Sequence, residues 1–245
     1  MKSLLPEYLK ELQLLWCLQN HAALAEQAAR QSWSHTAHLE RLLEGECLLR
    51  RENRSQRRLQ SARFPVPKTL DTFDWSWPKK IDRVHVQDLL RLAFLDTHAN
   101  VILLGGVGVG KSHIATALGR QACLAGHSVR WVSTIDMINA LVAAQAAQRL
   151  RQELRKYLAP TLLILDELGY LPIDKQGADL LFQVISARYE RGSILLTTNR
   201  PFKQWAGIFN NDTTLASAVL DRLLHHAQTI VIEGASYRMK DQINP

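Results

Sequence analysis

Cysteine is scarce in this chain of 245 residues, and long apolar runs are missing from it. The three cysteines, Cys17, Cys47 and Cys123, are odd in number and show no CxxC spacing, so neither a disulfide framework nor a zinc ribbon is indicated. No run approaches the roughly 18 apolar residues of a membrane span, and the first residues lack the apolar stretch of a signal peptide. We therefore expect a protein of the reducing cytoplasm that has no membrane partner.

Acidic residues are in deficit. Thirty Lys and Arg against 23 Asp and Glu give a formal net charge of +7, which favours an anionic partner such as nucleic acid. Many basic proteins bind only small phosphates, so the distribution of the charge has to decide. The length and the 47% hydrophobic content fit one α/β domain with a smaller appendage.

Residues 8–60 contain no proline and a single glycine, and their apolar positions recur at helical spacing, which predicts helices. Pro65 and Pro67 end this run and mark a domain boundary. The aromatic stretch 71–78 suggests a linker that packs on the following domain. The predicted organisation is a helical N-terminal domain that binds DNA or a partner (1–66), a linker and leading helix (67–98) and an α/β domain (99–245).

From residue 100 onward, short apolar runs alternate with longer helical patterns. Runs this apolar suit strands that are buried on both faces of a parallel sheet, and the intervening helices complete a βαβ series. The predicted fold class is α/β, a three-layer domain with a five-stranded parallel sheet. The expected strands are 101–104, 129–132, 162–165, 194–198 and 229–232.

A glycine-bearing loop follows the first predicted strand. Residues 105–112, GGVGVGKS, satisfy GxxxxGK[ST], and 115–124 read as the helix that the loop should open. Backbone N–H groups of such a P-loop cradle phosphates; Lys111 would reach the β- and γ-phosphates of ATP, and Ser112 would offer a hydroxyl to Mg²⁺. A glycine-rich turn with a solvated lysine is the alternative. The expected nucleotide-binding residues are Gly105, Gly106, Val107, Gly108, Val109, Gly110, Lys111, Ser112 and His113.

Two carboxylates, Asp166 and Glu167, end the apolar strand at 162–165, at the edge where open α/β sheets bind ligands. Asp166, with Ser112, is the expected Mg²⁺ ligand, and Glu167 is the expected general base for the attacking water. An acidic turn after a buried strand is the alternative.

Three further polar residues are candidates for the catalytic site. Asn199 ends another apolar strand and could position the lytic water, although an Asn before Arg200 and Pro201 also suits a turn. Arg222 and Arg238 could stabilise charge on a transferring phosphoryl group, or form surface salt bridges.

Arginines recur along one predicted helix with only Glu52 opposing them between residues 50 and 58, and a second basic cluster precedes residue 162 on a long predicted helix. Such faces suit sequence-independent contacts to a phosphate backbone, and a solvated helix face is the alternative. The expected DNA-binding residues are Arg50, Arg51, Arg54, Arg57, Arg58, Arg149, Arg151, Arg155 and Lys156.

Other residues carry weaker signals. The pairs His35 with His38 and His225 with His226 lack the further ligands of a convincing metal site, so a structural role is expected. Trp75 and Trp77 could stack on adenine or on a base, or pack the linker.

Together these segments resemble AAA+ ATPases of the initiator and helicase-loader group, and most closely the IstB-like ATP-binding family of transposition helpers. The similar blocks occur in the family's order, with an upstream segment at 42–75 also similar. The blocks are NVILLGGVGVGKSHIATAL (100–118), LLILDELGYLP (162–172), TTNRPFKQWAGIF (197–209), ASAVLDRLLHHA (216–227) and GASYRMKDQ (234–242).

This resemblance implies that Asn199 is sensor I, that Arg222 is an arginine finger acting on a neighbouring subunit and that Arg238 is sensor II. It implies a bacterial ATPase that assembles as a homo-oligomer with ATP on double-stranded DNA, presents the DNA to a cognate transposase, and is released or remodelled when ATP becomes ADP and phosphate. Only 13 residues follow Ile232, too few for the usual helical lid.

Two other functions fit the same ATPase residues. A replicative helicase loader of the DnaC type would bind a helicase through its N-terminal helices and touch single-stranded DNA. A small-molecule phosphotransferase would need a substrate pocket and no DNA.

Overall fold

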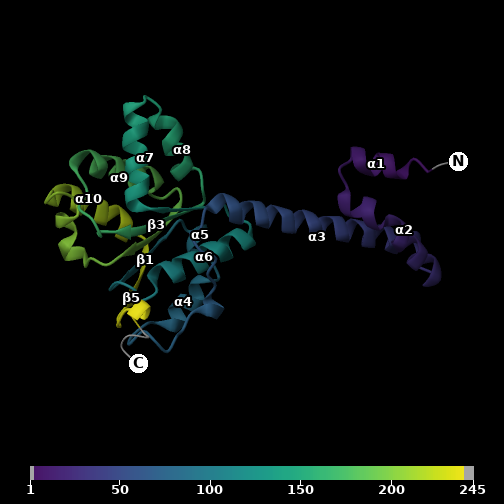
Figure 1. Ribbon diagram of the computed structural model, residues 1–245, viewed down its shortest axis with the longest axis horizontal. Coiled ribbons are helices and arrows are strands. Elements are labelled where there is room, and N and C mark those ends of the chain that lie inside the picture. Colours follow the sequence, from purple (N-terminus) through teal and green to yellow (C-terminus); the bar gives the residue numbers. More distant parts are fainter. Residues whose placement is uncertain (1–2, 240–245) are drawn as a thin grey trace. The chain divides into compact units, whose positions relative to one another are not determined.

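The computed structural model describes residues 3–239 and divides the chain into two compact units, Met1–Arg57 and Arg58–Pro245. Figure 1 shows helices alone in the first unit and a sheet with helices on both faces in the second. Within the described residues, no helix has the length and apolar character needed to cross a membrane.

The first unit contains α1 (Leu5–Glu11), α2 (Leu15–Arg30) and most of α3 (His35–Ala62), as the helical spacing predicts. A buried carboxylate joins α3 to α2: Glu46 accepts hydrogen bonds from the backbone N–H groups of Trp16 (2.9 Å) and Cys17 (3.4 Å). These amides lie in the first turn of α2, where a helix leaves its N–H groups without internal acceptors. Glu46 therefore caps α2 from a different helix.

The division between the units differs from the boundary predicted at residue 66. Ala62, in the last turn of α3, is fully buried in the core of the second unit, and Leu59 and Phe64 pack against that core. The two prolines mark the end of the helix, but the chain has already joined the second unit before it reaches them.

The second unit has a five-stranded parallel sheet in the order β2-β3-β4-β1-β5, which confirms the predicted fold class. The strands are β1 (Asn100–Gly105), β2 (Val129–Ser133), β3 (Leu162–Leu168), β4 (Ser193–Thr198) and β5 (Ala227–Ile232). The helices are η1 (Leu70–Thr72), α4 (Arg83–Leu89), α5 (Ala93–Asp96), α6 (Lys111–Ala125), α7 (Thr134–Ala146), α8 (Leu150–Leu158), α9 (Lys175–Arg188), η2 (Phe202–Gly207), α10 (Thr213–Leu224) and η3 (Tyr237–Met239).

Helices cover both faces of the sheet. Successive side chains of a strand point to opposite faces, so neighbouring residues of one strand join different cores. Leu162 and Ile164 of β3 join a core with α4, α5 and α6, whereas Leu163 and Leu165 join a core with α7, α8, α9 and α10. Figure 1 shows this three-layer arrangement. Because all the strands are parallel, their carboxyl ends lie at one edge of the sheet.

The long helix predicted before β3 is in fact two helices. Gln148 has φ +55°, in the left-handed region, and Arg149 is the N-cap residue of α8. A side chain in this backbone conformation interrupts a right-handed helix, so Arg149 lies in the break between α7 and α8 rather than on a continuous helix.

A buried guanidinium holds the chain where it enters two central strands. Arg188 of α9 donates to the carbonyl groups of Tyr157 (2.8 Å), Pro160 (2.9 Å), Thr161 (3.0 Å) and Ser193 (2.8 Å). Burial lowers the pKa of Arg188 to about 10. These bonds fix the amino ends of β3 and β4, whose carboxyl ends carry the candidate site.

Candidate functional site

The loop predicted to bind phosphates connects β1 to α6. Gly108 and Gly110 have φ values of +74° and +102°, which glycine adopts without strain, and Gly110 is the N-cap residue of α6. The backbone therefore turns sharply and points the start of α6 at the space above the sheet. The partial positive charge of that helix end attracts anions.

Lys111 lies at the start of α6 with only 4% of its surface exposed. Its Nζ donates to the carbonyl oxygens of Gly105 (2.8 Å) and Gly106 (2.6 Å), so the loop holds its own lysine. Burial lowers the pKa of Lys111, while the nearby carboxylates of Asp166 and Glu167 oppose that shift.

The two predicted carboxylates lie beside this loop, at the carboxyl end of β3. Ser112 Oγ donates to Asp166 Oδ1 at 2.9 Å, and Thr197 of β4 donates to the same oxygen at 2.5 Å. Thr134 fixes the backbone here, since its hydroxyl donates to the Asp166 carbonyl (2.9 Å). A hydroxyl and a carboxylate oxygen are the ligand types that Mg²⁺ prefers, so Ser112 and Asp166 fit a magnesium ion.

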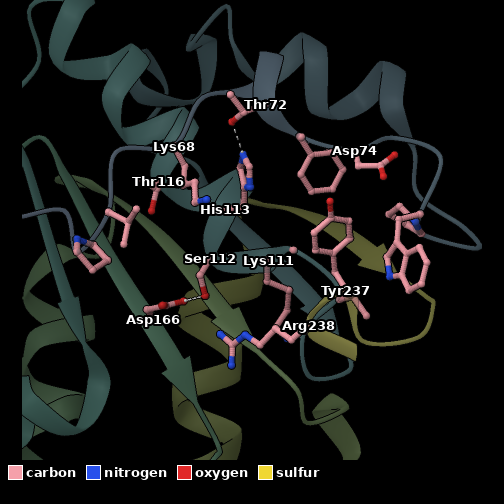
Figure 2. Close-up of a pocket in the computed structure, with 18 of the residues that line it drawn as sticks. Lys68, Thr72, Asp74, Lys111, Ser112, His113, Thr116, Asp166, Tyr237 and Arg238 are labelled. Carbon is pink, nitrogen blue, oxygen red and sulfur yellow. Dashed lines mark hydrogen bonds between the residues drawn. The ribbon is translucent and has the colours of Figure 1, made fainter. Parts of the chain in front are cut away.

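A cavity of about 560 Å³ opens over the loop and the carboxylates. This volume is within the range of about 300–1,000 Å³ for small-molecule sites. Figure 2 shows the Ser112–Asp166 pair on one side and Tyr237 on the other. The lining combines loop residues with the segment before α4 and the end of the described chain, including Pro65, Val66, Phe73, Trp77, Pro78, Trp131, Glu167, Tyr170 and Tyr237.

The segment after β5 closes one wall of the cavity. Glu233 pairs with Lys80 in an antiparallel bridge, and the Tyr237 backbone N–H donates to the Gly108 carbonyl at 2.9 Å. Trp77 donates from Nε1 to the Ala235 carbonyl (3.0 Å), and its ring meets that of Tyr237 edge to face. Within residues 3–239, η3 is the one helical element after β5.

His113 ties α6 to the linker. Its Nε2 donates to the Thr69 carbonyl at 2.7 Å, and its ring packs edge to face on Phe73. Burial lowers the pKa of His113, which favours the neutral imidazole. Phe73 is itself buried against this end of α6, whereas Trp75 packs on Phe73 and under Arg83. Of the two tryptophans, Trp77 lines the cavity and Trp75 packs the linker.

The remaining catalytic candidates lie in three places. Arg238 lines the cavity close enough to Lys111 to lower the pKa of that lysine, and Figure 2 shows the two side by side. Asn199 follows β4, and its Oδ1 is buried without a hydrogen-bond partner in the described structure. Arg222, in the last turn of α10, packs its guanidinium over Phe182 and donates to the Ala218 carbonyl, away from the cavity lining.

The residues predicted to bind DNA differ in their exposure and in their contacts with other residues. Arg50 donates from Nε to Glu46 (2.9 Å) and from a terminal nitrogen to the Gln13 carbonyl (3.0 Å). Its guanidinium therefore forms hydrogen bonds within the first unit. Arg51, Arg54 and Arg57 are exposed, and Arg58 is half-buried. In the second cluster, Arg149, Arg151, Arg155 and Lys156 are exposed, with Lys156 paired to Glu153.

The second histidine pair has a carboxylate neighbour that the sequence did not reveal. Glu190 lies 3.9 Å from His226, and the ligand atoms of Glu190, His225 and His226 all lie within 4.8 Å of one another. The three side chains are exposed, and the Tyr189 hydroxyl forms a hydrogen bond with His225 Nδ1 at 2.7 Å. Glu190 and His226 lie close enough to form an ion pair when the imidazole is protonated.

Thr197, Phe73 and Tyr237 are site residues that were not assigned from the sequence, whereas Trp77 was a candidate for stacking. Thr197 has a signal, because it is a hydroxyl residue two positions before Asn199 at the end of an apolar strand. The aromatic residues reach the loop through contacts between distant segments, which periodicity does not reveal.

The sheet order, the loop and the paired carboxylates define an ATP-binding P-loop domain of the AAA+ type. The chain belongs to the family described as IstB-like ATP binding protein, which matches residues 7–244. One relative, named as an ATP-binding protein of insertion sequence IS21 from Pseudomonas aeruginosa, is 43% identical over 90% of this chain and 83% of its own. Another, named for insertion sequence IS5376 of Geobacillus stearothermophilus, is 37% identical over 99% of this chain and 96% of its own.

Solved structures share the fold at lower identity. A structure of DnaI has a TM-score of 0.59 at 19% identity and covers 71% of this chain and 93% of its own. AMPPCP-bound DnaA from Aquifex aeolicus has a TM-score of 0.58 at 21% identity and covers 74% of this chain and 56% of its own. At these identities the likeness establishes the AAA+ fold.

Proposed function

We propose that this chain is an ATPase that assembles as an oligomer with ATP on double-stranded DNA and presents that DNA to a partner transposase. The observation that carries the ATPase proposal is the convergence of Lys111, Ser112, Asp166 and Glu167 on one cavity of about 560 Å³. The transposition role is supported by the relatives, which are named as ATP-binding proteins of insertion sequences.

In the proposed site, phosphate oxygens replace the loop carbonyls as partners of Lys111. The N–H groups of the loop and the start of α6 would hold the same phosphates. Ser112 and Asp166 already share a hydrogen bond of 2.9 Å, and they would hold Mg²⁺ between them and the nucleotide. When bound, Mg²⁺ neutralises charge on the β- and γ-phosphate oxygens.

Glu167 is the proposed base that takes a proton from the attacking water. It lines the cavity and is exposed to it, whereas Asp166 is 4% exposed, so the two neighbouring carboxylates have different surroundings. Asn199, which follows β4, is the proposed residue that orients the attacking water; its Oδ1 is buried without a hydrogen-bond partner in the described structure. Arg238 would contact phosphate in its own subunit, and Arg222 would act on the nucleotide of a neighbouring subunit.

DNA contacts are proposed for the exposed basic residues. Arg51, Arg54 and Arg57 lie on α3 of the first unit, and Arg149, Arg151 and Arg155 lie in and before α8 of the second. Contacts of this kind read the backbone rather than the base sequence, and they weaken as salt rises. The predicted binding is therefore sequence-tolerant and salt-sensitive.

The test uses the full-length protein and two variants, Lys111→Ala and Glu167→Gln. With ATP and Mg²⁺, the natural chain is expected to bind duplex DNA cooperatively and to release phosphate. Lys111→Ala should lose both activities, because it removes the charge that holds the phosphates. Glu167→Gln should keep nucleotide-dependent DNA binding, yet its turnover should fall by about 10²–10⁴-fold, the usual contribution of a general base.

Three results would overturn parts of this proposal. Loss of DNA binding by Glu167→Gln at full nucleotide affinity would show that assembly does not precede hydrolysis. A helicase loader would be favoured if the protein captured a hexameric replicative helicase and did not capture a transposase encoded by a neighbouring gene. Phosphorylation of a metabolite without DNA would indicate a phosphotransferase.

A further inference from the structure

The two acidic residues of the site lie in an irregularity between β3 and β4. Leu165 pairs with Leu196, but the next pair along the ladder is Leu168 with Thr198. Asp166 and Glu167 on β3 therefore face the single residue Thr197 on β4. Two residues against one is the pattern of a β-bulge, which bends a strand and redirects its side chains.

The bulge changes where the side chains point. In a regular strand, Asp166 and Glu167 would lie on opposite faces of the sheet, since side chains alternate. Here Glu167 has φ +63°, in the left-handed region that non-glycine residues rarely adopt. Both carboxylates line the same cavity as a result.

One hydroxyl contacts both acidic residues. Thr197 is fully buried; its Oγ1 donates to Asp166 Oδ1 and accepts the backbone N–H of Glu167 at 2.9 Å. A bulge leaves an amide without its ladder partner, and a buried amide without an acceptor is costly. Thr197 supplies that acceptor and at the same time orients the carboxylate that also accepts from Ser112 (2.9 Å).

We propose that Thr197 is a positioning residue of the ATPase site: its hydroxyl sets the side-chain orientation of Asp166 and the backbone conformation of Glu167 together. This inference rests on the proposed ATPase function. Thr197 does not contact the nucleotide in this role. It acts through Asp166 on the magnesium ion and through Glu167 on the attacking water.

The hydroxyl can be separated from the shape of the side chain. Thr197→Val keeps the volume and the branching but removes the donor and the acceptor, whereas Thr197→Ser keeps the hydroxyl and loses a methyl group. Thr198→Val is a matched control, because it removes the neighbouring buried hydroxyl, whose hydrogen bond is to the Arg200 amide (3.1 Å).

The experiment measures kcat and KM for ATP, nucleotide affinity with and without Mg²⁺, and thermal unfolding for all three variants. We expect Thr197→Val to lower kcat by about 10²-fold, the size of effect that a misplacement of about 1 Å produces. Its nucleotide affinity without Mg²⁺ should be unchanged, and a higher Mg²⁺ concentration should be needed for full affinity. Thr197→Ser should recover kcat to within a few-fold, and Thr198→Val should keep the kcat of the natural chain.

Two results would refute the assignment: unchanged kcat and Mg²⁺ dependence in Thr197→Val, or a Thr197→Ser variant as impaired as the valine variant. If Thr197→Val does not fold, Thr197→Ser and Thr197→Ala replace it, because they differ by the hydroxyl alone. If the natural chain binds nucleotide but does not hydrolyse it, the proposed ATPase function fails. Thr197 is then judged by the Mg²⁺ dependence of nucleotide binding.

Discussion

The two units of this chain are stabilised in different ways. The sheet unit buries apolar residues on both faces of five strands, with Ile102, Leu163 and Ile164 fully buried. In the described part of the helical unit, the buried residues are Leu9, Cys17, Gly45 and Glu46. Leucines are exposed there at positions 4, 5, 12, 15, 39, 43 and 48.

This difference indicates which interactions matter in each unit. Apolar burial, at about 25 cal/mol per Å², dominates the sheet unit and changes little with pH or salt. The helical unit depends more on one buried carboxylate that caps α2 and pairs with Arg50. The sheet unit should therefore hold a rigid catalytic site, while the helical unit should respond to its surroundings.

The largest expected effect is in the sheet unit, at its buried arginine. Arg188→Ala should reduce the free energy of unfolding by about 3–5 kcal/mol, because it leaves several buried carbonyl groups without a donor. Urea unfolding followed by circular dichroism measures this loss. Arg191→Ala, at an exposed position nearby, is the control and should change stability by less than about 0.5 kcal/mol. Equal effects of the two substitutions would show that the hydrogen bonds of the Arg188 guanidinium do not stabilise the fold.

A smaller effect is expected at Glu46 in the helical unit. Burial opposes ionisation of Glu46, but the hydrogen bonds from Arg50, Trp16 and Cys17 outweigh it and lower its pKa. A carboxyl group with a lowered folded-state pKa stabilises the fold above its ordinary pKa, and that contribution disappears as the pH falls through the folded-state pKa. The helical unit should therefore open in acid before the sheet unit does.

Glu46→Gln should remove this acid dependence and destabilise α2 by about 1–3 kcal/mol at neutral pH. Hydrogen exchange of the α2 amides measures local opening without requiring the unit to be isolated. Glu44→Gln is the matched control, since Glu44 is exposed and pairs only with Arg41 among its described ion-pair partners. The same acid profile in both variants would show that Glu46 does not hold α2.

The smallest expected effect separates two arginines on one helix. Arg54→Ala should weaken duplex DNA binding several-fold and reduce the salt dependence by about one phosphate contact, with stability unchanged. Arg50→Ala should instead speed hydrogen exchange in α2, because Arg50 bonds to Glu46 and to the Gln13 carbonyl. If Arg50→Ala reduces the salt dependence as much as Arg54→Ala and leaves exchange unchanged, Arg50 contacts DNA and the distinction is wrong.

The sequence predicted those features that depend on local pattern. Apolar runs such as 162–165 identified the strands. The P-loop motif at 105–112, followed later in the chain by the acidic pair Asp166 and Glu167, identified the main residues of the cavity. The predicted helix through Arg149 was wrong because the left-handed backbone at Gln148 has no signal in residue type. Helices were predicted within residues 8–60, but the bounds of the three separate helices came only from the structure.

Features that depend on contacts between distant segments were not predicted. The bulge at Asp166 and Glu167 involves a strand 30 residues away, through the bond from the Glu167 amide to Thr197. The closure of the cavity by Trp77 and the Tyr237 segment joins opposite ends of the second unit. The pairing of Arg50 had a local signal, because Glu46 is four residues earlier on the same helix, but only the fold shows that Glu46 is buried.

The central claim is that the loop ending in Lys111 and Ser112 binds the phosphates of Mg²⁺-ATP. Isothermal titration of the full-length protein with ATP, in the presence and absence of Mg²⁺ and of duplex DNA, tests it most directly. We predict saturable binding to one site per chain that Mg²⁺ strengthens and that Lys111→Ala abolishes in a folded protein. Absence of binding under all these conditions, or equal binding by Lys111→Ala, would contradict the account.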